Sequence, residues 1–185
     1  MRWNSTAESR WRMKRRRLLS NPFLLFMPTL PSPPAQSVHF SSASDEWATP
    51  ADLFALLDRE FGFTLDAAAT AENAKCAKFF TKEDSALERD WQRYAARDWA
   101  GVQSATTITA EARGAVWLNP PYSRGLQAAF LEKARKEAGK FRGPTVVCLI
   151  PARTDTKVWH ETIFGQAEVR FLKGRLRFGD AEARA

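Results

Sequence analysis

The sequence has few of the side chains that bind soft metal ions. Its 185 residues include two cysteines, Cys76 and Cys148, and two histidines, His39 and His160. No pair among them has the spacing of a zinc site, so we expect no metal. Cys148 lies in the apolar run 146–150 and is most simply a buried core residue. So few cysteines are consistent with a reducing cytoplasm.

Long apolar runs are also missing at the start of the chain. The longest uninterrupted one in residues 1–37 covers residues 23–27, which is too short for a signal-peptide core or a membrane span. The same segment contains a basic run and Pro31-Ser32-Pro33-Pro34. We therefore expect residues 1–37 to be a basic, proline-rich, disordered extension, followed by one domain over residues 38–185.

Excess positive charge is concentrated in that extension. The net charge is +7, and residues 1–37 contain seven basic residues and one acidic residue. The remaining chain contains 21 basic and 20 acidic residues, so a nucleic-acid surface there would need local clustering of cations. With 44% apolar residues in the whole chain, one domain with a hydrophobic core is expected.

Periodic patterns in the rest of the chain predict alternating helices and strands. A helix over residues 50–61 follows Thr49, which can cap it, with Asp52 completing a capping box. Residues 92–114 lack a sustained pattern and are interpreted as an insertion or long surface loop, with helix around 91–99. The other expected elements are strands at 63–65, 115–118 and 145–150, helices at 125–138 and 156–164, and a hairpin of 168–172 with 175–178. The strand, helix, strand succession implies a parallel crossover and an α/β fold.

Two of these helices carry further expectations. In the helix at 125–138, Glu132 and Lys136 are spaced to form an exposed ion pair. Asp155 is expected to cap the helix at 156–164. The inner stripe of the first helix is expected to contain Leu126, Phe130, Ala134 and Ala138.

The most informative stretch is Asn119-Pro120-Pro121-Tyr122, which directly follows the strand at 115–118. The prolines end the strand and stiffen the turn. The amide oxygen of Asn119 and a proline carbonyl can accept hydrogen bonds from an exocyclic amine, and the Tyr122 ring can stack on a planar base. A stiff turn after an ordinary core strand explains these four residues equally well.

Polar residues follow two other expected strands. Asp66 precedes three alanines, an arrangement that suits close backbone approach to a flat or extended cofactor, or an Asp cap before a short helix. Arg153 lies in the loop after the strand at 145–150 and could contact a phosphate or be an ordinary surface cation. Loops at the carboxyl ends of parallel strands are where such folds bind ligands.

Taken in order, these motifs resemble the phage-type DNA N-6-adenine methyltransferases. The resemblance extends from Val38 to Asp180 and includes five motifs, at residues 45–50, 61–66, 119–122, 151–156 and 174–179. It implies a Rossmann-like methyltransferase fold that uses S-adenosyl-L-methionine. It also implies that Asn119, Pro120, Pro121 and Tyr122 form the catalytic floor for an extruded adenine, with Arg153 contacting double-stranded DNA.

The resemblance assigns residues to the cofactor as well. Thr49 and Pro50 would lie beside its methionine end, and Asp66 with Ala67 would replace the usual glycine-rich motif. Asp84 or Asp90 would border the adenosine, although Asp98-Trp99 repeats Asp90-Trp91, so that either copy could be the family element. The implied setting is the cytoplasm of a bacterium that hosts a phage or prophage, without a membrane or a metal as partner.

The sequence also departs from the family's pattern. Its basic start is unusual, residues 92–114 are long, and the apolar strand that usually follows the Arg-Phe-Gly element is absent, which would leave an unpaired sheet edge. Two alternatives therefore stay open. The acceptor could be a cytosine amine or a glutamine amide of a protein, or the chain could be an inactive remnant that only binds DNA.

Overall fold

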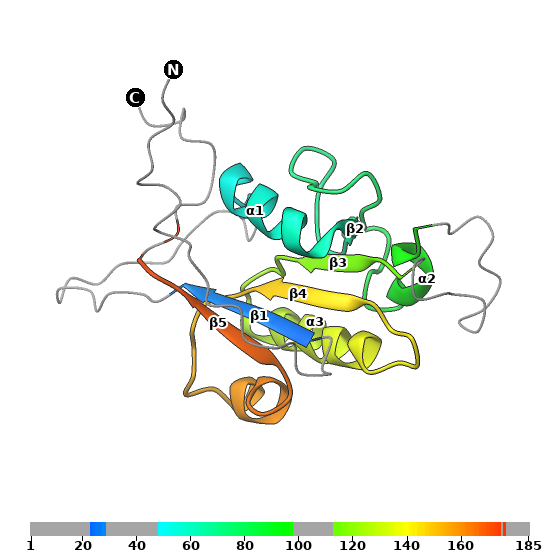
Figure 1. Ribbon diagram of the computed structural model, residues 1–185. Coiled ribbons are helices and arrows are strands. Elements are labelled where there is room, and N and C mark those ends of the chain that lie inside the picture. Colours follow the sequence, from blue (N-terminus) through cyan, green and yellow to red (C-terminus); the bar gives the residue numbers. More distant parts are fainter. Residues whose placement is uncertain (1–22, 29–47, 98–112, 175, 177–185) are drawn as a thin grey trace, which may run out of the picture.

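The computed structural model describes residues 23–28, 48–97, 113–174 and 176. Within them lies a five-stranded sheet in which every neighbouring pair is parallel (Figure 1). The strand order is β2-β3-β4-β1-β5. The strands are β1 (Phe23–Pro28), β2 (Phe63–Asp66), β3 (Ala115–Leu118), β4 (Thr145–Leu149) and β5 (Glu168–Leu172). The predicted α/β class is confirmed.

Helices cover both faces of this sheet. One face is covered by α1 (Ala51–Phe61), and the other by α3 (Arg124–Ala138) and the short π-helix η4 (Trp159–Ile163) (Figure 1). The short helix α2 (Trp91–Ala95) lies where β2 and β3 begin, because the hydroxyl of Thr64 donates a hydrogen bond to the carbonyl of Ala95 at 2.6 Å. The fold therefore has three layers.

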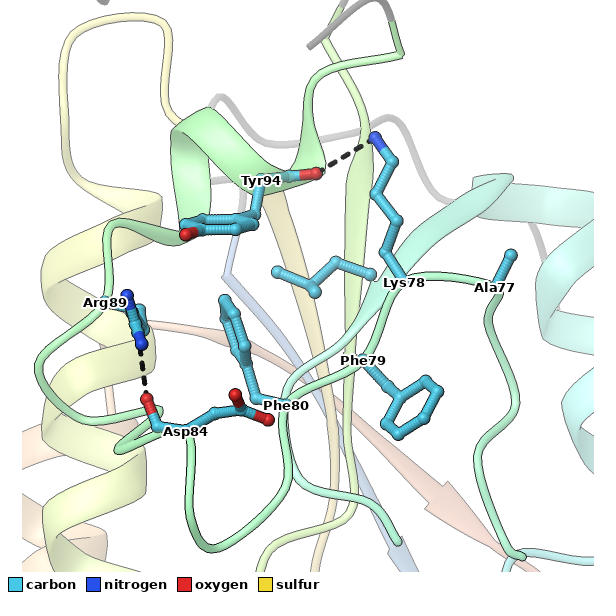
Figure 2. Close-up of a pocket in the computed structure, with 8 residues that line it drawn as sticks. Ala77, Lys78, Phe79, Phe80, Asp84, Arg89 and Tyr94 are labelled. Carbon is cyan, nitrogen blue, oxygen red and sulfur yellow. Dashed lines mark hydrogen bonds between the residues drawn. The ribbon is translucent and has the colours of Figure 1, made fainter. Parts of the chain in front are cut away.

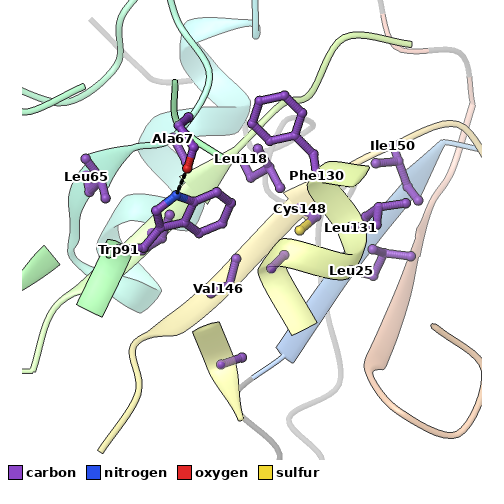
Figure 3. Packing of buried hydrophobic residues seen from close by; sticks show 14 of the residues in the cluster. Leu25, Leu65, Ala67, Trp91, Leu118, Phe130, Leu131, Val146, Cys148 and Ile150 are labelled. Carbon is purple, nitrogen blue, oxygen red and sulfur yellow. Dashed lines mark hydrogen bonds between the residues drawn. The ribbon is translucent and has the colours of Figure 1, made fainter. Parts of the chain in front are cut away.

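Alternation along the central strands produces two hydrophobic clusters, one on each face. The cluster on the α3 face includes Val116, Leu118, Val146, Cys148 and Leu131 (Figure 3). The cluster on the α1 face includes Trp117, Val147, Leu149, Leu53 and Leu57. Because β3 and β4 are buried on both faces, the loops that follow them are held on a rigid support.

The strand β1 corrects the expectation that residues 1–37 form a disordered extension. It lies between β4 and β5, where Leu25 is paired with Cys148 on one side and Val169 on the other. Leu25 is 0% exposed. A central parallel strand is a short apolar run, so the run at 23–27 had the length of a strand although it was too short for a membrane span. The rest of residues 1–37 lies outside the described residues.

The bounds of α1 and α3 agree with the predicted helices to within one residue, but the predicted cap of α1 is wrong. Pro50 occupies the N-cap position without a side-chain capping hydrogen bond, and Thr49 is buried beside it at 5% exposure. The side chain of Asp52 instead accepts a hydrogen bond from the adjacent amide of Leu53 at 2.8 Å. The capping-box spacing in the sequence therefore did not predict the hydrogen bonds at the start of α1.

Three of the four residues in the predicted inner stripe of α3 are buried, namely Phe130, Ala134 and Ala138 at 8%, 0% and 4% exposure, but the prediction is wrong for Leu126. Leu126 is 41% exposed, whereas Gln127 and Glu137 are buried at 7% and 1% exposure. The predicted ion pair between Glu132 and Lys136 is present, with 3.5 Å between the charged atoms. Polar residues on the inner face misled a prediction based on apolar spacing.

Other expectations near the C-terminal part of the chain change as well. Thr156, rather than Asp155, caps the turn before η4, because its hydroxyl accepts a hydrogen bond from the amide of Trp159 at 3.3 Å. β5 pairs in parallel with β1. Of the expected second hairpin strand, residues 175–178, only Leu176 is described. Residues 98–112 of the expected insertion lie outside the part of the chain that the structure describes.

Candidate functional site

Three polar loops meet at the carboxyl edge of the sheet. They follow β2, β3 and β4, which are neighbours and parallel, so all three loops leave the sheet on the same side. The amide of Ala67 donates to the carbonyl of Trp117 at 2.9 Å, which extends the pairing with β3 by one residue beyond the end of β2. Thr49 lies at this edge too, because α1 runs back to the opposite edge before β2 begins. The fold therefore gathers Thr49, Asp66, Asn119 and Arg153.

The turn after β3 has an internal hydrogen bond. The hydroxyl of Tyr122 lies 3.0 Å from the side-chain oxygen of Asn119 and donates to it. Pro120 is buried, and Asn119, Pro121 and Tyr122 are partly buried. The two prolines restrict the backbone between the bonded side chains, so the geometry of Asn119 is defined before any ligand arrives.

Arg153 extends the site from the next strand. Burial raises the pKa of the Tyr122 hydroxyl above its ordinary value, and the positive charge of Arg153 acts in the opposite direction. The phenol therefore keeps its hydrogen at neutral pH. β3 and β4 are neighbours in the sheet, so the loops that carry Tyr122 and Arg153 leave the same edge from adjacent strands. Arg153 itself is exposed, so it can also reach a ligand outside the fold.

Asp66 organises the loop after β2. Its carboxylate is 2% exposed and accepts hydrogen bonds from the amides of Lys75 at 3.0 Å and Ala68 at 3.3 Å. Burial raises the pKa of Asp66 to about 6, although these backbone bonds and the charge of Lys75 oppose the rise. The carboxylate thus folds residues 66–75 into a compact loop, whose Ala67 is 0% exposed and whose Ala68 is partly buried.

Asp84 lies on the same side of the sheet as this loop. Phe79 is bridged in parallel to Asp66, so the chain after Phe80 leaves at the carboxyl edge. The carboxylate of Asp84 accepts hydrogen bonds from the amide and the hydroxyl of Thr81, at 2.8 and 2.9 Å. These bonds lower the pKa of Asp84, so it is an acceptor at neutral pH.

Asp90 is not brought to this edge. It is the N-cap of α2, where its carboxylate accepts from the amide of Arg93 at 3.4 Å, and it pairs with Lys140 at 3.0 Å. Burial alone would raise the pKa of Asp90, but the bond and charge of Lys140 lower it overall. Lys140 follows the C-terminal end of α3, whose 15 residues span about 20 Å from the turn that carries Asn119. Asp98, the other copy, lies outside the described residues.

A cavity of about 310 Å³ lies beside the bridged segment (Figure 2). It is lined by Leu65, Ala77, Lys78, Phe79, Phe80, Asp84, Arg89 and Tyr94. The ammonium group of Lys78 donates to the carbonyls of Tyr94 and Ala96, at 3.2 and 2.8 Å, and so closes the C-terminal end of α2. Phe80 belongs to the core cluster, and Phe79 forms the isolated bridge with Asp66. Asp84 is the one lining residue that the sequence had assigned to a cofactor.

The described ranges contain neither a metal-binding cluster of side chains nor a helix that could cross a membrane. No group of three His, Cys, Asp or Glu side chains among those residues is arranged to hold a metal ion. Among the same residues, none of the helices combines the length and the apolar character that crossing a membrane requires.

Polar loops at the carboxyl edge of a parallel sheet define a ligand-binding α/β domain. The family model described as DNA N-6-adenine-methyltransferase (Dam) matches residues 36–185, and the chain belongs to this family. The resemblance drawn from the five sequence motifs is thereby confirmed. The matched range begins after β1, so this strand is contributed by chain outside the family match.

Two relatives are similar to the chain. A DNA N-6-adenine-methyltransferase of Escherichia phage T1 is 31% identical over 133 residues, which are 71% of this chain and 46% of the phage protein. A putative methyltransferase of Escherichia coli K12, YfdM, is 33% identical over 105 residues, which are 56% of this chain and 98% of that protein. The chain therefore spans less than half the length of its phage relative. No solved structure matches it significantly.

Proposed function

We propose that this chain is an adenine-specific DNA methyltransferase with a Rossmann-like fold, which transfers a methyl group from S-adenosyl-L-methionine to the exocyclic amine of adenine. The observation that carries the proposal is the turn of Asn119, Pro120, Pro121 and Tyr122 at the carboxyl edge, beside the Asp66 loop. Family membership supports the same reaction.

The residues near this turn fit the chemistry of the cofactor. S-adenosyl-L-methionine offers hydroxyl and ammonium donors, for which the partly buried carboxylate of Asp84 would be an acceptor. Asp66 and Thr49, at 2% and 5% exposure, would shape the backbone beside the cofactor. Ala67 and its neighbouring alanines present only methyl groups, which permits close approach of the backbone. Pro50 lies beside Thr49 at the start of α1. When bound, the cofactor supplies an electrophilic methyl group. Asp90, at the opposite edge, is left out of this set.

The chain's own contribution to the reaction is to position the amine. The side-chain oxygen of Asn119 and a carbonyl of the proline pair would accept its two hydrogens, which directs the nitrogen lone pair away from them. The ring of Tyr122 would stack on the base and keep it in the plane of those acceptors. A general base is not required in this geometry, because the amine proton becomes acidic only after transfer.

Extraction of the base from the duplex costs a few kcal/mol, which contacts to the backbone must offset. Arg153 is suited to this role because it is exposed beside the turn that would hold the base. A guanidinium group there would bind a phosphate of double-stranded DNA near the extruded nucleotide.

Methyl-labelled S-adenosyl-L-methionine, incubated with the protein and double-stranded DNA and followed by digestion to nucleosides, tests the proposal. We expect label in N6-methyl-2′-deoxyadenosine. Label in methylcytosine, or in a protein acceptor offered in parallel, would overturn the choice of acceptor. Absence of label from every acceptor would instead support an inactive DNA-binding remnant, especially if the cofactor failed to raise the melting temperature.

Replacement of Asn119 with Ala is the matched variant. It should remove methylation while preserving the shift in melting temperature caused by S-adenosyl-L-methionine, because the variant lacks only the acceptor for the amine. Methylation that survives the substitution would show that Asn119 does not hold the amine.

A further inference from the structure

The ring of Tyr122 is proposed to stack on the base, and the hydroxyl of the same side chain makes a separate hydrogen bond. The hydroxyl donates to the side-chain oxygen of Asn119 at 3.0 Å. We propose that this hydroxyl is a positioning group. It holds the carboxamide of Asn119 so that its oxygen, and not its amino group, faces the base that stacks on Tyr122. The inference rests on the proposed function, because it concerns how the amine of the target base is held.

A carboxamide needs such a group because its two ends have nearly the same shape. Rotation by half a turn exchanges an acceptor oxygen for an NH₂ donor. In the wrong orientation, Asn119 would present a donor to an amine that is itself a donor, and the hydrogen bond would be lost. The prolines fix the backbone of the turn but cannot distinguish the two orientations. A hydrogen-bonding partner on the side chain can.

A hydroxyl can donate or accept, so its own direction has to be set. The hydroxyl donates to Asn119, and the positive charge of Arg153, which acts on Tyr122, disfavours a hydroxyl hydrogen that points toward the cation. Burial keeps the phenol protonated by raising its pKa. The side-chain oxygen of Asn119 has two lone pairs, so it can accept from Tyr122 and from the amine together.

Substitution of Tyr122 by Phe separates the hydroxyl from the ring. Stacking is preserved, so the KM for DNA and the melting-temperature shift caused by the cofactor should stay unchanged. The single-turnover rate of methyl transfer should fall about 5- to 10-fold, the range expected for loss of one neutral hydrogen bond. Thr145→Val supplies the control, since it removes a hydroxyl at the start of β4, at the edge of the sheet opposite to the turn, and should leave the rate unchanged.

A second background distinguishes orientation from mere support of the turn. In the Asn119→Asp variant both side-chain oxygens are acceptors, so no orientation has to be chosen. Adding Tyr122→Phe to that variant should therefore change its rate less than two-fold. An equal fall in both backgrounds would show a structural role only and would overturn the proposal, as would an unchanged rate in Tyr122→Phe alone.

The Arg153→Met variant gives a further measurement that does not depend on the activity of Asn119→Asp. At saturating DNA, Arg153→Met should slow methyl transfer when it is introduced into the unaltered protein. When it is introduced into the Tyr122→Phe variant, it should have little further effect on the rate. Equal slowing in both would contradict the role of the hydroxyl. If the unaltered protein placed no label in adenine, the proposed function would fail. If it did and these rate patterns were absent, only the positioning role would fail.

Discussion

Glu137 and Lys140 form an ion pair in which the carboxylate is buried and the ammonium is partly exposed. Their charged atoms are 2.7 Å apart, and the Glu137 side chain is 1% exposed. The other carboxylate oxygen pairs with Lys133 at 2.8 Å. The backbone amide of Gln92 also donates to the Glu137 carboxylate, at 3.3 Å. One carboxylate therefore ties the C-terminal end of α3 to the start of α2.

Replacement of Glu137 by Ala should lower the free energy of unfolding by about 2 kcal/mol. The substitution removes two ion pairs and leaves the buried backbone amide of Gln92 without its acceptor. The loss is limited because both lysines can still be solvated by water. Urea denaturation measures the change. Glu132→Ala on the same helix is the control, because its pairs with Arg135 and Lys136 are solvent-exposed and should contribute less than about 1 kcal/mol. Equal losses would show that burial of Glu137 has no importance.

Two buried glutamines provide a matched comparison. The amide nitrogen of Gln92 donates to the carbonyls of Phe141 and Arg142, at 2.8 and 2.9 Å. The amide nitrogen of Gln127 is buried without a hydrogen-bond partner among the described residues. Gln127→Met should therefore be neutral or stabilise the fold by up to about 1 kcal/mol, whereas Gln92→Met should destabilise it by about 2 kcal/mol. Denaturation midpoints at a constant m-value check both, and a clear loss of stability in Gln127→Met would contradict the assignment.

Leu25 tests whether β1 belongs to the folded domain. It is fully buried between β4 and β5, so Leu25→Ala should lower the free energy of unfolding by about 2–5 kcal/mol. Leu126→Ala, at a position that is 41% exposed, should cost much less. Thermal unfolding of the full chain compares the two variants. A Leu25→Ala variant as stable as the unaltered protein would mean that residues 23–28 do not pack in the sheet in solution.

Asp66 should make stability depend on pH in the direction opposite to most carboxylates. Its pKa rises from 3.8 to about 6 on folding, so the folded state binds the proton more tightly than the unfolded state. The contribution to stability is present below pH 4 and is lost as the pH rises to about 6, by about 3 kcal/mol at 1.36 kcal/mol per pKa unit. Asp66→Asn removes this titration. The difference in unfolding free energy between the two proteins, measured from pH 4 to pH 7, should change accordingly, and a constant difference would contradict the raised pKa.

Strong local patterns explain the elements that could be predicted. The helix α1 has apolar residues at helical spacing and ends at Gly62, which adopts a left-handed conformation at φ 63°. The strand β3 is an apolar run ended by two prolines, and α3 follows it directly. Each of these signals lies within a few residues of the element that it defines, so the bounds were correct to about one residue.

Local patterns failed where the partner is distant in sequence. Gln127 and Glu137 face inward on α3, although spacing alone placed Leu126 there. Glu137 tolerates burial because the nearby Lys133 and Lys140 compensate its charge and the backbone amide of Gln92, from a distant segment, donates to its carboxylate. No periodicity rule contains that information, since it depends on how closely the helix packs.

Local sequence was enough to predict that Asn119 and Tyr122 lie on a stiff turn at the end of a buried strand, because prolines and apolar runs act locally. It also placed Asp66 and Arg153 after two other strands. The order of the strands, including the place of β1 between β4 and β5, became known only from the three-dimensional structure. The structure also places Asp84 at the carboxyl edge of the sheet and Asp90 at the opposite edge. Strand order depends on pairing between segments far apart in the chain, and hydrogen bonds of that kind leave no local pattern.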